Sequence, residues 1–158
     1  MSLRAVVAMV LPVAVAVVAG TAVAQEIEGI ADVRSGNEIA VGETRVRLYG
    51  SNAPGLKDTC ESGERRFRCG VTAWAELILL ADGRRVSCDV EKRRGSGGSV
   101  FATCYVGERD INEALVRSGW AEAAQDVDRY RADQEDARRS RRGLWAGRIR
   151  PPDRRQAP

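Results

Sequence analysis

Two of the four cysteines lie symmetrically about a glycine-rich turn, and this symmetry restricts the fold more than any other feature of the sequence. The segments Arg84–Glu91 and Ser99–Val106 predict two strands, with the turn between them centred on residue 96. Folding the hairpin there places Cys88 opposite Cys104. Opposed Cβ atoms of an antiparallel pair lie about 4.5–5.5 Å apart, which is near disulfide reach. The sequence therefore predicts a β-hairpin cross-linked by Cys88 and Cys104.

The N-terminal residues 1–24 have the pattern of a signal peptide. Arg4 precedes an apolar run over residues 5–20, and Ala22-Val23-Ala24 is typical of a cleavage site. A membrane anchor is the alternative, but the run is short for a span and ends in small residues. We therefore expect export to the periplasm or the extracellular medium. No membrane span is expected in the mature chain, since no other apolar run approaches the required length.

An exported chain with an even number of cysteines favours disulfides. Four cysteines allow three connectivities, and the hairpin pairing leaves Cys60 to pair with Cys69. A zinc site is the alternative. It needs closely spaced cysteines or histidines, and the sequence has no cysteine pair at that spacing and no histidine.

The absence of histidine also restricts catalysis. It excludes Ser-His-Asp, Cys-His and paired-histidine chemistry, so any hydrolysis needs carboxylates, arginines and a metal ion. The formal net charge is +3, and eight arginines lie within residues 138–155, where Asp153 is the only acid. This basic segment is either a polyanion contact or a set of cations that stabilises a helix C-terminus.

The hydrophobic pattern predicts three more strands and three helices. These are strands Glu26–Val33, Glu38–Val41 and Thr44–Tyr49, and helices Gly70–Ala81, Ile111–Arg117 and 128–140. We expect Val71, Trp74 or Ala75, Ile78 and Ala81 to share one apolar face of the helix, and residues 56–68 to be a polar loop. Five strands and three helices indicate an α+β protein built on a small β-barrel.

The segment Arg45–Gly55 predicts a strand that runs into a turn rich in Gly, Asn and Pro. It is similar to the V-R-L-x-G-[IV]-D-[AT]-P-E signature of the staphylococcal nuclease (thermonuclease) family. Further matches are A-T-C-Y-V-G at residues 102–107, D-I-N-E-A-L-V-R-S-G-W-A at 110–121 and R-G-L-W at 142–145. In this order the segments resemble that family over about residues 31–145. The resemblance implies a five-stranded OB-type barrel with three helices, here expected at residues 25–148 and followed by a disordered basic tail at 149–158.

The resemblance also implies where catalytic groups are expected. Arg47 matches an arginine that contacts phosphate, and it is retained. Asn52 stands at the position of a calcium-binding aspartate, and Gly55 at the position of the general-base glutamate. The turn at residues 35–38 reads S-G-N-E where the family has D-G-D-T, so Asn37 replaces another aspartate.

Other charged residues could take over from the missing groups. Glu38 is a weak candidate metal ligand beside Asn37. Ser99 falls at the position of the family's second arginine, while Arg93 and Arg94 lie upstream and are candidate phosphate contacts. The alternative for these two arginines is a solvated hairpin.

These departures predict a catalytically degenerate member of the family, a pseudoenzyme without a metal cofactor. We expect a binding or scaffold domain, with nucleic acid bound weakly or a nucleotide as ligand. The alternative is an active, calcium-dependent phosphodiesterase whose relocated site combines Glu38, Asp58 or Glu61 with Arg47 and Arg93. A structural or envelope-associated protein without a ligand is a third hypothesis. The sequence identifies no aromatic stacking surface and no oligomeric state.

Overall fold

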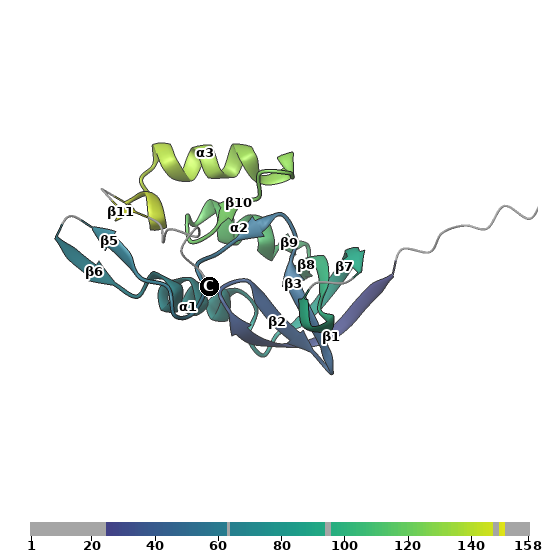
Figure 1. The fold of residues 1–158 in the computed structure, drawn as a ribbon. Helices are drawn as coiled ribbons and strands as arrows, with labels where there is room; N and C mark the ends of the chain where they lie inside the picture. The colour runs from purple at the N-terminus through teal and green to yellow at the C-terminus, as the bar shows by residue number, and fades with distance from the viewer. Residues whose placement is uncertain (1–24, 63, 94–95, 147–148, 151–158) are drawn as a thin grey trace, which may run out of the picture.

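The structure is a computed structural model. It describes residues 25–62, 64–93, 96–146 and 149–150 (Figure 1). The predicted signal peptide at residues 1–24, the candidate Arg94 and residues 151–158 of the predicted tail lie outside the described residues.

The chain forms strands, α-helices and short 3₁₀ turns in the following order. The first part contains β1 (Glu26–Ser35), β2 (Glu38–Val41), β3 (Thr44–Leu48), β4 (Ser51–Asn52), β5 (Cys60–Ser62), β6 (Arg65–Phe67), α1 (Cys69–Ala81) and β7 (Arg85–Arg93). The second contains η1 (Ser96–Gly98), β8 (Val100–Val106), β9 (Arg109–Asp110), α2 (Ile111–Arg117), β10 (Glu122–Ala123), η2 (Asp128–Tyr130), α3 (Arg131–Arg139), η3 (Gly143–Trp145) and β11 (Ile149–Arg150).

Five of these strands close into a barrel. The sheet order is β3-β2-β1-β7-β8, and β3 also pairs in parallel with β8, which joins the two ends. The other ladders in the barrel are antiparallel. Alternate residues such as Ala31 and Val33 on β1 and Val46 and Leu48 on β3 are buried, as a strand with one face to the core requires. The predicted five-stranded OB-type barrel with three helices is confirmed.

Both predicted disulfides are present. Cys88 on β7 is the register partner of Cys104 on β8, with a Cα–Cα distance of 4.0 Å. Cys60 is bonded to Cys69, with a Cα–Cα distance of 5.6 Å. The hairpin symmetry therefore predicted the pairing correctly.

The observed helices lie close to the predicted residue ranges, but the buried face of α1 differs from the predicted one. α2 is where it was predicted, and the Asp110 carboxylate caps it by accepting from the Glu113 N–H at 2.9 Å. α1 buries Ala73, Leu77, Leu80 and Ala81 most completely. Of the predicted face, Ala81 is buried, Trp74 and Ile78 are partly buried against the core, and Val71 is partly exposed. The centre of the buried face is therefore shifted from the predicted one. The cause is that α1 is apolar on most sides, and its periodicity does not single out one face.

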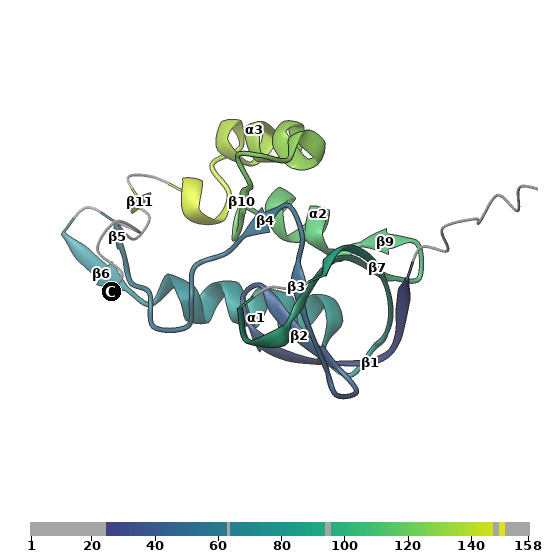
Figure 2. The same cartoon turned by 45° about the vertical axis from the view of Figure 1, so that its right-hand side comes forward.

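The predicted polar loop 56–68 was wrong in its second half. β5 and β6 form a hairpin there, and β11 adds a third strand in the order β11-β5-β6 (Figure 2). Ile149 and Arg150, at the start of the predicted tail, thus form a strand that pairs with β5. The pairing of β5 with β11 joins segments far apart in sequence, so no local pattern indicates it. Among the described residues, no helix is long and apolar enough to cross a membrane.

Candidate functional site

Three segments of the barrel meet at one end of β3. The Asn37 carbonyl accepts a hydrogen bond from the Leu48 N–H at 3.0 Å, which fixes the turn after β1 beside β3. Gly36 makes this approach possible, because a Cβ atom there would lie 3.1 Å from the Ala53 Cβ and 3.2 Å from the Pro54 carbonyl oxygen. The structure therefore places the turn that carries Asn37 next to β3 and to the turn 53–55.

Arg47 lies on β3 opposite an aromatic ring. In the parallel β3–β8 pairing its register partner is Phe101, and its guanidinium carbon lies 5.5 Å from the centroid of that ring. This is within the range of a cation–π contact. The strand pairing and the ring together hold the Arg47 guanidinium in place as a candidate phosphate contact.

A cavity of about 200 Å³ has Phe101 in its wall, while Arg47 lies outside its lining and is next to it through the Phe101 ring. Its lining is Leu48, Tyr49, Gly50, Asn52, Phe101, Ala124, Asp126 and Val127. The walls are mostly apolar with a few polar groups, which is the usual composition of a small-molecule site. An aromatic wall next to a cation suits a nucleobase joined to a phosphate.

The far wall of this cavity is held by backbone contacts to β4. The Ala124 N–H donates to the Gly50 carbonyl at 2.9 Å, and Glu122 on β10 is the register partner of Asn52. Gly50 has a φ of 73°, and a Cβ atom there would lie 3.1 Å from both Val127 and the Tyr130 ring. Glycine is therefore required at position 50 for the segment to pack this closely.

Asn112 stabilises the segment at the end of β3 through hydrogen bonds to the surrounding backbone. Its side-chain amide donates to the carbonyls of Tyr49 at 2.9 Å and Ala102 at 3.0 Å. Its Oδ1 accepts from the Cys104 N–H at 3.2 Å, and the residue is fully buried. This one side chain ties α2 to β8 and to the start of the cavity wall.

The side-chain oxygens of Asn37, Glu38 and Asn52 do not form a set of ligands that suits a calcium ion. Asn37 and Asn52 offer neutral amides, and the Asn37 Oδ1 accepts a hydrogen bond from the Ser35 hydroxyl at 3.1 Å. Glu38 pairs with Arg45 at 2.9 Å, so the candidate metal ligand is already engaged. Within the described ranges, no group of three or more acidic, histidine or cysteine side chains could hold a metal ion. Hard divalent cations are normally held by several carboxylate and carbonyl oxygens.

Among the other carboxylates considered for a relocated site, Asp58 lies closest to the general-base position. Its Oδ2 accepts a hydrogen bond from the Gly55 N–H at 2.8 Å. A Cβ atom on Gly55 would lie 3.6 Å from that oxygen. Glu61 lies on β5 and pairs with the exposed Arg66 at 3.3 Å. The three candidate carboxylates are thus engaged in different local contacts.

The hairpin candidates have different positions. Ser99 is fully buried at the start of β8. Arg93 ends β7 opposite Val100, and its side chain lies outside the described part of the structure, as does all of Arg94. A Cβ atom on Gly97 would lie 3.3 Å from Arg45 Nη1, so the tip of the β7–β8 hairpin comes close to the Arg45 side chain on β3.

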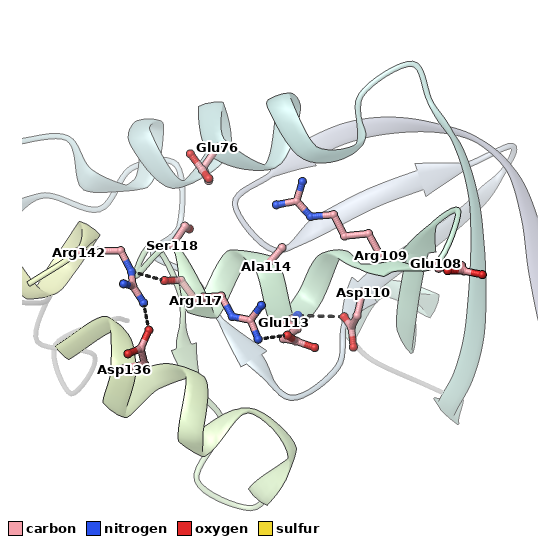
Figure 3. Close-up of a pocket in the computed structure, with 10 residues that line it drawn as sticks. All are labelled: Glu76, Glu108, Arg109, Asp110, Glu113, Ala114, Arg117, Ser118, Asp136 and Arg142. Carbon is pink, nitrogen blue, oxygen red and sulfur yellow. Dashed lines mark hydrogen bonds and ion pairs between the residues drawn. The ribbon is translucent and has the colours of Figure 1, made fainter. Parts of the chain in front are cut away.

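A larger cavity, of about 530 Å³, lies among α1, α2 and α3, away from these residues (Figure 3). Arg117 pairs there with Glu113 and, at 2.8 Å, with Asp133. Arg142 pairs with Asp136 and donates to the Arg117 carbonyl at 2.8 Å. The Arg142 hydrogen bond lowers the pKa of the Asp136 carboxyl below its usual value. These ion pairs connect the helices, which indicates a structural role for the charged residues that line this cavity.

Sequence reasoning missed Phe101, Tyr49 and Asp126 as cavity residues. Phe101 reaches Arg47 only because β3 and β8 pair in parallel when the barrel closes. Asp126 lies in an irregular segment between β10 and η2. No short-range signal in the sequence brings these residues together.

The fold and the cavity define a small OB-type barrel protein with a cavity at one strand end. The family model for staphylococcal nuclease homologues matches residues 45–147, and the chain belongs to this family. A comparison with curated proteins gives no match.

Proposed function

We propose that this protein is a catalytically degenerate member of its family that binds single-stranded nucleic acid or a nucleotide without calcium-dependent hydrolysis. The observation that carries the proposal is the composition of the turns at the end of β3. Asn37, Asn52 and Gly55 occupy the positions at which the family resemblance expects two calcium-binding aspartates and a general base. The backbone that positions them is in place.

The expected loss of rate is large. Removing one well-placed electrostatic group typically lowers the rate by about a hundred- to a thousandfold. A missing general base costs about a hundred- to ten-thousandfold. These factors do not multiply cleanly when the groups act as a unit, but two such losses already reduce cleavage to near background.

The ligand is assigned from the cleft. Phe101 and Tyr49 supply aromatic surface in the cavity, and Arg47, which contacts the Phe101 ring but is not in the cavity lining, supplies a nearby cation. Single-stranded nucleic acids are bound without sequence preference by this combination of cations and aromatic rings. Export is supported by the N-terminal pattern at residues 1–24 and by the two disulfides, which favour an oxidising compartment.

Changing the cleft should weaken binding of short single-stranded DNA. We expect Arg47→Gln to lower affinity about tenfold, because a hydrogen bond to a charged group is worth about 1.5–3 kcal/mol. We expect Phe101→Leu, which keeps an apolar side chain but removes the ring, to lower affinity at least about fivefold, since stacking is worth about 1–3 kcal/mol per base. Fluorescence anisotropy at low salt measures both effects.

The control for this experiment is Arg84→Gln, a loss of the same charge at an exposed position outside the cleft. Equal affinities for this control and Arg47→Gln would show that only net charge matters. Absence of any binding at low salt would favour a scaffold role without a ligand.

One observation favours the alternative of an active nuclease. The Asp58 carboxylate lies next to Gly55, where the family's general base is expected. In that case the protein cleaves single-stranded DNA in a metal-dependent reaction, and Asp58→Asn lowers the rate by a hundredfold or more, as expected for a lost general base. Absence of cleavage by the unchanged protein rules this alternative out, and cleavage that is unchanged by Asp58→Asn rules out Asp58 as the general base.

A further inference from the structure

The β5–β6 hairpin forms a separate arm that ends next to the turn 53–55. We define the basic arm as residues 60–69, described except for residue 63, with Cys60–Cys69 closing its base. β6 lies at the edge of the three-stranded sheet, because β5 separates it from β11. Figures 1 and 2 show this sheet projecting from the barrel near the start of α1.

The base of the basic arm is packed and covalently closed. Cys60 and Cys69 are fully buried and form a second small core with Leu144, against which Phe67 and Trp120 pack. A cross-linked, packed base limits the movement of the strands that extend from it. The arm therefore presents its exposed side chains in a defined orientation.

Those exposed side chains are mainly arginines. Arg65, Arg66 and Arg68 are all exposed, and residues 60–69 contain two acids, Glu61 and Glu64, giving a net charge of +1. Arg66 pairs with Glu61 at 3.3 Å, an exposed pair that contributes little to stability. With the residues that the structure describes, the side chains of Arg65 and Arg68 form no ion pair. The packing of the arm does not use them.

The arm ends next to the turn 53–55, which directly follows the cavity-lining residue Asn52. Gly70 follows the arm, and a Cβ atom there would lie 1.7 Å from the Gly55 carbonyl oxygen. The Gly70 N–H also donates to the Asp58 carbonyl at 3.3 Å. Arg68, two residues before Gly70, is thus anchored beside the turn 53–55. A polyanion that extended from Asn52 along this turn would approach the arginines of the arm.

We propose that the basic arm is a second phosphate-contacting surface, which extends the cleft so that the protein prefers single-stranded oligonucleotides to mononucleotides. This inference rests on the proposed function. Arg65 and Arg68 would each contact one backbone phosphate, and the Arg47–Phe101 cleft would hold one nucleotide. Charged side chains on an edge strand also discourage sheet-to-sheet association, so the test must separate binding from edge protection.

The test compares two double variants that lose the same charge. Arg65→Gln with Arg68→Gln removes the two cations of the arm that form no ion pair with a described residue. Arg84→Gln with Arg85→Gln removes two exposed cations just after the other end of α1. α1 has 13 residues, so the two sites are separated by roughly 20 Å at 1.5 Å per residue. All four positions are exposed, and unchanged thermal unfolding confirms that both variants are folded.

Affinity is measured for a single-stranded 12-mer of DNA and for a mononucleotide, each over a series of salt concentrations. For the 12-mer, the arm variant is expected to bind about tenfold more weakly at low salt. Its slope of log affinity against log salt is expected to fall in magnitude by about 1.4, or about 0.7 for each lost phosphate contact. Its affinity for the mononucleotide is expected to match that of the unchanged protein.

If the arm variant binds the 12-mer as the Arg84/Arg85 variant does, the arm inference is overturned while the cleft proposal stands. If the unchanged protein binds neither ligand at low salt, the proposed function fails and the arm inference fails with it. The two failures are therefore distinguishable in one set of titrations.

Discussion

A variant with Asn37→Asp, Asn52→Asp and Gly55→Glu is expected to cleave single-stranded DNA in calcium at least about a hundredfold faster than the unchanged protein. The changes restore two carboxylates at the amide positions and a base at Gly55. Each group of this kind is typically worth about a hundredfold or more in rate. The measurement is release of acid-soluble nucleotides with calcium and with a chelator.

The structure has room for these side chains. The two Asn→Asp changes keep the side-chain shape, and the Ser35 hydroxyl that donates to Asn37 can donate equally to a carboxylate. At Gly55 the nearest atom to a new Cβ is Asp58 Oδ2 at 3.6 Å, an ordinary contact distance. Ser99, the position of the family's second arginine, is left unchanged because it is fully buried and a guanidinium there would be desolvated.

The matched control carries the same two aspartates with Gly55→Gln. Glutamine has nearly the size of glutamate but cannot accept the proton from water, so calcium can bind without efficient cleavage. A folded triple variant that is no faster than this control would show that the turns do not hold the groups in a productive geometry.

The second large effect is expected at Asn112. Replacing it with alanine should lower the free energy of unfolding by about 3–5 kcal/mol, because a buried polar group left unpaired costs about 1–3 kcal/mol. Three backbone groups lose the hydrogen bond to Asn112, namely the Cys104 N–H and the carbonyls of Tyr49 and Ala102. The Ala102 carbonyl keeps the bond from the Tyr49 N–H at 2.9 Å. Urea denaturation measures the change.

Gln125→Ala is the control for Asn112, because Gln125 is an exposed polar residue and surface changes usually stay within about 0.5 kcal/mol. A loss below about 1 kcal/mol for Asn112→Ala would mean that water or a small rearrangement satisfies the three backbone groups. The hydrogen bonds of Asn112 would then contribute little to the attachment of α2 to the cavity wall.

The parts of the fold that the sequence predicted are those determined over short distances. The hairpin around residue 96 brings Cys88 to Cys104 through its own register, and α2 begins at a local cap formed by Asp110. The face of α1 could not be predicted, because Leu77 and Ile78 are equally apolar and only the barrel determines which one is buried.

The candidate site shows the same division. The resemblance indicated Asn37, Arg47, Asn52 and Gly55, whose segments meet at the end of β3. Phe101 could not be anticipated because its contact with Arg47 depends on the closure of the barrel.

The most direct test of the account is to incubate the unchanged protein with single-stranded DNA and RNA at low salt, with calcium or with a chelator, and to record binding and cleavage together. We predict binding that is the same in both conditions and cleavage at background in both. Robust cleavage that requires calcium would contradict the account, and persistence of that cleavage in Arg47→Gln would show that the active site lies elsewhere.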